Sequence, residues 1–157
     1  MRGIEISNRC RGLRLAAEEV AAALRCLDAH FPRRPPPGNL SVVFLDESTM
    51  GELHGRFLAD PSPTDVITFP GDPSFGEAGE ICAGAERAAR VADAHNHGLD
   101  AELTLYLAHG WLHLAGYDDR TPGERARMRA AEQEALAQVR EGPGLPSFAL
   151  VSAPPDP

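Results

Sequence analysis

Residues 100–119, DAELTLYLAHGWLHLAGYDD, contain the pattern that organises the C-terminal half of the chain. Residues 100–114 are predicted to form a helix that ends near Gly116, because a glycine readily adopts the left-handed conformation of a helix cap. His109 and His113 are four residues apart, so we expect their side chains on the same face of this helix. This spacing suits two imidazoles that bind one metal ion.

A third ligand is expected from the acidic residues after the glycine turn. Asp119 is the candidate, and Asp118 is the alternative. Two imidazoles and one carboxylate leave a coordination position for water, which is typical of catalytic rather than structural zinc sites. In the alternative interpretation, the two histidines are unrelated helix residues and Asp119 only stabilises the N-terminus of the next helix.

The remaining elements are predicted from periodicity, composition and turn residues. Thr121, Pro122 and Glu124 have the spacing of a capping box ahead of a helix that runs to Arg140. Other helices are predicted over residues 13–27, 47–58 and 85–97, and strands over residues 4–10, 40–45, 64–70 and 80–83. We therefore expect an α+β fold with a single domain over residues 1–141, built from a mixed sheet of about four strands and packed helices. Residues 142–157 are expected to be a flexible tail.

Composition and charge limit the classes of function. The chain has 157 residues and a net charge of −8, which argues against a polybasic nucleic-acid-binding coat. The first 34 residues nevertheless carry seven arginines against four acidic residues, so RNA phosphates are expected to approach there; a solvated basic face is the alternative. Neither a membrane span nor a signal peptide is expected, and three cysteines without Cys-x-x-Cys spacing favour a cytoplasmic protein.

Residues 109–118, HGWLHLAGYD, resemble the signature of the YbeY family, bacterial metal-dependent endoribonucleases that act in ribosomal RNA maturation. Further resemblance lies in Arg56, in residues 63–70 (PTDVITFP) and in residues 79–81 (GEI), so it spans most of the chain from about residue 4 to residue 140. It implies the same α+β layout and cleavage of single-stranded RNA. It also implies a role at the 3′ end of small-subunit ribosomal RNA and in ribosome quality control, with small-subunit proteins as candidate partners.

The resemblance also implies roles for individual residues. It assigns a Zn²⁺ ion, or another divalent ion, to His109, His113 and Asp119, and it gives Arg56 the catalytic role of holding negative charge on the phosphodiester. The family has a third histidine where this chain has Asp119. Because a carboxylate lowers the net charge of the site by one, it opposes the ionisation of bound water. We therefore expect a weaker or pH-shifted nuclease.

Two other functions are compatible with the same residues. In one, the protein assists ribosome assembly without catalysis, and the metal only joins the last two helices; a structural site of this kind would normally have four protein ligands, whereas the sequence supplies three. In the other, the protein is a metalloprotease-like hydrolase. That function is less favoured because Gly110 stands where the His-Glu-x-x-His motif has its glutamate base.

Overall fold

A four-stranded mixed sheet forms the centre of the computed structural model, which describes residues 2–56 and 66–151, except for the side chains of residues 54–56. The strand order is β1 (Ile4–Arg9), β3 (Asn39–Leu45), β5 (Glu77–Gly84) and β4 (Val66–Pro70). β1 and β5 run parallel to β3, whereas β4 runs antiparallel to β5. The predicted mixed sheet of about four strands is confirmed, and β1 lies at one edge of it.

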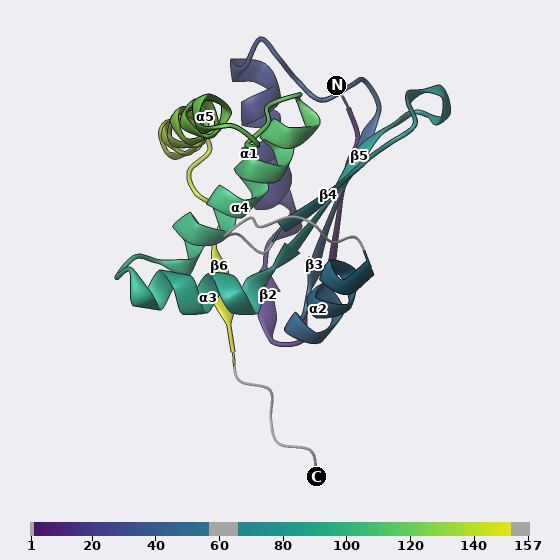
Figure 1. Cartoon of the computed structure of the whole chain (residues 1–157). Helices are drawn as coiled ribbons and strands as arrows, with labels where there is room; N and C mark the ends of the chain where they lie inside the picture. Colours follow the sequence, from purple (N-terminus) through teal and green to yellow (C-terminus); the bar gives the residue numbers. More distant parts are fainter. Residues whose placement is uncertain (1, 57–65, 152–157) are drawn as a thin grey trace.

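Helices cover both faces of this sheet (Figure 1). α1 (Ala17–His30), α4 (Leu99–Leu114) and α5 (Pro122–Glu141) lie together on one side, and α2 (Glu47–Arg56) lies on the other. α3 (Ala85–Ala94) follows directly from β5 and packs beside α4, while the short 3-10 helix η1 (Pro73–Phe75) connects β4 to β5. Successive residues of a strand point to opposite faces, so the sheet has a core on each side.

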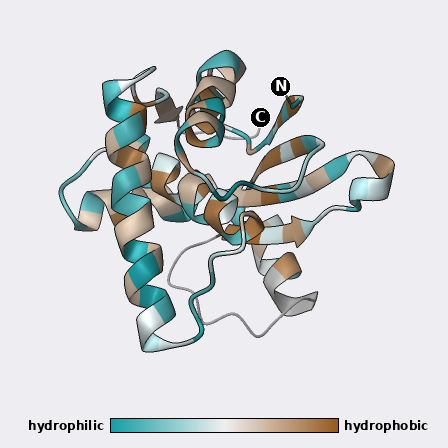
Figure 2. Cartoon of the chain, turned by 90° about the horizontal axis from the view of Figure 1, so that it is seen from above, coloured by the Kyte–Doolittle hydropathy of each residue, from teal (hydrophilic) through white to brown (hydrophobic). Residues whose placement is uncertain are grey.

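The larger core lies between the sheet and α4. Trp111 and Leu112 are fully buried, and α4 is apolar on almost all sides, as expected of a helix in the interior. Hydrophobic stretches follow the strands, and hydrophilic residues cover the outer turns of the helices (Figure 2). No helix in the described ranges combines the length and the apolar character needed to cross a lipid bilayer.

Gly110 is the point of closest approach between α4 and the sheet. A Cβ at this position would lie 2.7 Å from Cγ2 of Ile81 on β5 and 3.2 Å from Cγ2 of Thr68 on β4. Only a residue without a side chain therefore allows the helix to lie this close. The contact fixes the position of α4, and hence of its two histidines, relative to β4 and β5.

The predicted boundaries of the C-terminal helices are largely confirmed. α4 ends at Leu114, and Gly116 has a φ of 104°, in the left-handed region. Oγ1 of Thr121 accepts a hydrogen bond from the backbone N–H of Glu124, whose carboxylate accepts one from the N–H of Thr121. This is the predicted capping box at the start of α5.

The helix predicted over residues 13–27 begins later in the chain than its periodicity predicts. Leu13–Leu15 form strand β2, which pairs antiparallel with β6 (Phe148–Leu150), and α1 begins only at Ala17. Gly12, with a φ of 91°, turns the chain between β1 and β2. Over three residues the alternation of apolar and polar side chains suits a strand as well as a helix, and the partner strand decides between the two.

Strand β6 lies inside the segment expected to be a flexible tail. Phe148 is buried against Phe44, with ring centroids 5.6 Å apart, and its backbone N–H donates to Oδ1 of Asp100 at 2.7 Å. These contacts, together with the pairing to β2, correct the expectation for residues 148–150, because they bury an aromatic side chain and satisfy the backbone. Residues 152–157 lie outside the described ranges.

Candidate metal centre

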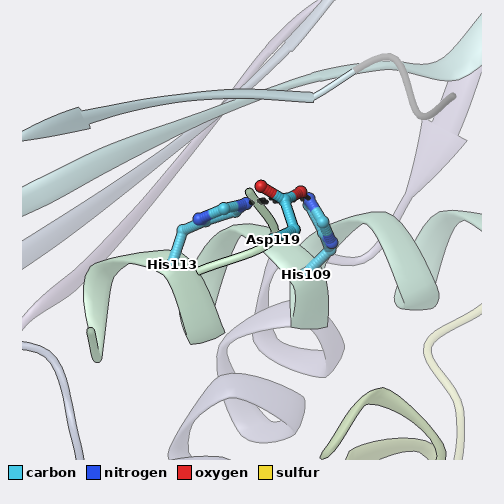
Figure 3. Close-up of side chains that lie close together, drawn as sticks. All are labelled: His109, His113 and Asp119. Carbon is cyan, nitrogen blue, oxygen red and sulfur yellow. Dashed lines mark hydrogen bonds and ion pairs between the residues drawn. The ribbon is translucent and has the colours of Figure 1, made fainter. Parts of the chain in front are cut away.

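His109 and His113 project from the same side of α4, one helical turn apart (Figure 3). Their Nε2 atoms are 3.0 Å apart, and their ring planes meet at 80°. The side chain of His109 is 8% exposed and that of His113 is 22% exposed. The expected convergence of the two imidazoles is therefore present, and one of them is accessible to solvent.

The loop after α4 brings Asp119 back to these imidazoles. Gly116 turns the chain, and its N–H donates to the carbonyl of His113 at 3.0 Å. Oδ2 of Asp119 lies 3.4 Å from Nε2 of His113 and 3.8 Å from Nε2 of His109. Figure 3 shows the carboxylate of Asp119 between the two rings.

Asp118, the alternative third ligand, makes different contacts. Its Oδ1 accepts a hydrogen bond from the backbone N–H of Asp119 at 2.8 Å, and its Oδ2 lies 3.4 Å from Nε of Arg120. The guanidinium of Arg125, on α5, donates to the backbone carbonyls of Asp119 and Arg120 at 3.3 and 3.1 Å. Of the two aspartates, Asp119 is thus the one whose side chain the loop brings to the histidines.

Glu132 of α5 is a member of the site that sequence reasoning missed. Its Oε2 lies 2.8 Å from Nδ1 of His109, and both side chains are largely buried. A neutral His109 that donates its Nδ1 hydrogen to this carboxylate has its lone pair on Nε2, the atom that faces His113 and Asp119. Such a partner orients a metal-binding imidazole and raises its basicity. The one available signal in the sequence was a glutamate four residues after Met128, on the buried side of α5.

The geometry and charge of this group fit a divalent metal ion. Within the described ranges, ligand atoms of His109, His113 and Asp119 all lie within 4.8 Å of one another. Ligands about 2.0–2.1 Å from a tetrahedral zinc ion are roughly 3.3 Å apart, and the observed separations of 3.0, 3.4 and 3.8 Å span that value. The carboxylates of Asp119 and Glu132 supply two negative charges, which balance the charge of a divalent cation.

The cysteines do not provide an alternative donor set. Burial and a contact of Sγ with Glu80 raise the pKa of the Cys82 thiol to about 12, and burial raises the pKa of Cys10 to about 11. Burial also raises the pKa of Cys26. Because only the thiolate is a good metal ligand, these protonated side chains are poor donors to a metal ion.

Arg56 cannot be placed in the site. It is the last residue of α2, but its side chain lies outside the part of the chain that the structure describes. Residues 57–65, which include the first part of the motif at residues 63–70, also lie outside that part. The catalytic role of Arg56 therefore stays a prediction.

The α+β fold of this chain has a counterpart among solved structures. The solution structure of TM1509 from Thermotoga maritima matches 90% of this chain and 94% of its own length, with a TM-score of 0.57 and 24% sequence identity. This likeness shows that the two proteins share a fold.

Sequence comparisons identify the family. The model of the family described as endoribonuclease YbeY matches residues 6–140. A protein named endoribonuclease YbeY from Mycobacterium sp. (strain KMS) is 37% identical over 147 residues, covering 86% of this chain and 82% of the relative. One of the same name from Thermobifida fusca is 36% identical over 135 residues, covering 80% of this chain and 87% of the relative. The chain belongs to the endoribonuclease YbeY family.

Proposed function

We propose that this protein is a metal-dependent endoribonuclease that cleaves single-stranded RNA in the cytoplasm. Its proposed place is the maturation of ribosomal RNA, at the 3′ end of the small-subunit RNA, and ribosome quality control. Membership in the endoribonuclease YbeY family supports the nuclease activity and the RNA substrate. The observation that carries the proposal is the triangle formed by Nε2 of His109, Nε2 of His113 and Oδ2 of Asp119.

Zn²⁺ is the proposed ion because two imidazoles and a carboxylate belong to the donors that zinc accepts. A carboxylate in the third position also admits harder divalent ions. When bound, such an ion supplies Lewis acidity toward a phosphate oxygen and lowers the pKa of a bound water. His109, His113 and Asp119 would hold it.

The chain's own residues prepare the site for a phosphodiester. Glu132 holds the ring of His109, and Arg125 holds the backbone of the loop that carries Asp119. The side chains of His113 and Asp119 are 22% and 27% exposed, so the group is in part accessible from outside the protein. We assign to Arg56 the task of holding negative charge as it develops on the phosphodiester.

The position of Gly110 disfavours a metalloprotease. In a His-Glu-x-x-His site the glutamate acts as a general base beside the metal. Position 110 instead faces the sheet, where a Cβ would already lie 2.7 Å from Ile81. A glutamate side chain would not fit there, so this helix supports nuclease chemistry better than peptide hydrolysis.

Metal content and RNA cleavage, measured together on the same variants, test the proposal. The variants are His113→Ala and Asp119→Asn, and His95→Ala, which alters an exposed histidine at the end of α3, is the matched control. We expect one zinc ion per chain and cleavage of an unstructured RNA, but not of its duplex, for the wild type and the control. Both site variants should lose the ion and the cleavage while circular dichroism shows an intact fold.

The outcomes separate nuclease activity from a structural role of the metal. If the site variants lose zinc and unfold together while the wild type does not cleave RNA, the metal joins α4 to the following loop and the nuclease proposal is wrong. Cleavage by metal-free wild-type protein would equally contradict metal dependence.

A further inference from the structure

A pocket of about 930 Å³ lies between the C-terminal part of α1 and the chain that leads into β3. Arg2, Arg25 and Arg34 line it together with Asp28 and several prolines. None of its lining residues belongs to the candidate metal centre. With three arginines against one aspartate, the pocket is locally positive in a chain whose net charge is −8.

Two of the three arginines are available to a ligand. Nε of Arg2 forms an ion pair with Asp28 at 2.9 Å, and its other nitrogens donate to backbone carbonyls of residues 35, 36 and 38. Arg2 therefore serves the structure of the pocket. Arg34 is exposed and Arg25 is half-buried, and within the described ranges neither guanidinium takes part in a hydrogen bond or an ion pair. Two cationic side chains without a partner in one pocket suit an anion that accepts hydrogen bonds from both.

The wall of the pocket is held in place before any ligand arrives. Pro32 and residues 35–37 restrict the backbone of the loop, since proline fixes φ. The three hydrogen bonds from Arg2 tie the same loop to the start of β1. A ligand that binds here does not have to order the loop, which favours affinity.

The pocket and the candidate metal centre are connected through α4 and the loop that follows it. Nε1 of Trp111, which lies between His109 and His113 in the sequence of α4, donates to Oδ1 of Asp28 at 3.2 Å. The guanidinium of Arg33 lies 5.1 Å from the ring centroid of Tyr117, in the loop that carries Asp119. Arg33, which follows Pro32 of the pocket lining, therefore places one positive charge against the loop that carries Asp119.

From these contacts we propose that the pocket binds a backbone phosphate of the RNA strand whose scissile phosphate lies at the metal centre. Arg25 and Arg34 donate to that phosphate, and Arg33 lies along the path between the two sites. This inference rests on the proposed endoribonuclease function. Of the seven arginines in the first 34 residues, it assigns contact with RNA to Arg25, Arg33 and Arg34.

The test compares two double variants that remove the same charge from the N-terminal segment. Arg25→Gln with Arg34→Gln alters the pocket, whereas Arg11→Gln with Arg14→Gln alters exposed arginines near β2, outside it. Binding of a fluorescein-labelled 12-nucleotide oligouridylate to the full chain is measured by fluorescence anisotropy in EDTA, which prevents metal-dependent cleavage. The single variant Arg34→Glu is included because Arg34 is exposed, so its replacement should leave the fold intact.

We expect the pocket double variant and Arg34→Glu to raise Kd about tenfold or more. Each lost phosphate contact should reduce the slope of log Kd plotted against the logarithm of the salt concentration by about 0.7. The control double variant should change Kd less than threefold. With zinc-loaded enzyme, the pocket variants should raise KM for the 12-mer at unchanged kcat and leave cleavage of a dinucleotide unchanged.

Three results would overturn the inference. Equal losses of RNA affinity in the pocket variants and the control variant would show a diffuse electrostatic effect. An unchanged Kd in both pocket variants would show that the pocket does not bind RNA. Displacement of the oligouridylate by polyglutamate at equal charge concentration would assign the pocket to an acidic peptide. If wild-type protein binds through the pocket yet never cleaves, the proposed function fails while the pocket stands.

Discussion

Replacing Glu132 by glutamine should weaken zinc binding at the candidate centre about 10–100-fold, because His109 loses the anionic acceptor that orients its ring. Nδ1 of His109 and Oε2 of Glu132 are 2.8 Å apart, and their side chains are 8% and 12% exposed. A hydrogen bond to a charged group contributes about 1.5–3 kcal/mol. A tenfold change in Kd corresponds to about 1.4 kcal/mol, so this energy matches the expected loss of affinity.

Glu134 offers a matched control on the same helix. Its Oε1 also lies 2.8 Å from a histidine nitrogen, Nε2 of His30, but the two side chains are 54% and 30% exposed. Exposed ion pairs contribute about 0.2–1 kcal/mol. Glu134→Gln should therefore leave zinc affinity unchanged and lower stability only slightly.

The assay is a competition titration of zinc against a chromophoric chelator at neutral pH, performed on both variants and on the wild type. ¹⁵N NMR of the metal-free protein provides a second readout, since Glu132→Gln should reduce the fraction of His109 that carries its hydrogen on Nδ1. Equal zinc affinity of Glu132→Gln and wild type would refute this reasoning. So would an equal loss of affinity in Glu134→Gln, because the effect would then not depend on the contact with His109.

Three further predictions concern packing, metal chemistry and titration. Gly110→Ala should gain about 1 kcal/mol of helix propensity but lose about 1–3 kcal/mol because the added methyl group overpacks against the buried side chain of Ile81. Urea unfolding should therefore show a lower free energy of unfolding than for the wild type. A clear increase would contradict the packing of α4 on β5. Asp119→His removes a negative charge and should move the acidic limb of the pH–rate profile of RNA cleavage to lower pH, and an unchanged profile would refute the assigned role. The pKa of the Cys82 thiol is raised from 9.0 to about 12, so the folded state keeps a proton that the unfolded state releases. The stability that this thiol contributes is complete below pH 9 and is lost as pH rises toward 12, which pH-dependent urea titrations of wild type and Cys82→Ala should show; equal alkaline losses in the two proteins would contradict it.

Features that depend on nearby residues could be predicted from the sequence. The capping box of Thr121 and Glu124 is local, and so is the left-handed turn at Gly116. His109 and His113 share a face of α4 for the same reason, since a separation of four residues is one helical turn. The return of Asp119 follows from the short loop, although its preference over Asp118 depends on hydrogen bonds that only the structure shows.

Features that depend on distant residues could not be predicted in this way. Leu13–Leu15 become a strand because β6 supplies a partner from near the other end of the chain. Glu132 reaches His109 only because α5 packs against α4, and the spacing of the two residues in the sequence indicates nothing about that contact. The pocket beside Arg25 likewise requires a proline-rich loop to fold back over α1. Periodicity along one segment carries no information about such pairings.

The central claim is that His109, His113 and Asp119 hold one divalent ion. Anomalous diffraction at the zinc edge from crystals grown with zinc tests it most directly. We predict a single strong peak about 2.0–2.2 Å from Nε2 of both histidines and from a carboxylate oxygen of Asp119. Crystals in which zinc binds elsewhere on the protein, but not between His109, His113 and Asp119, would contradict this claim.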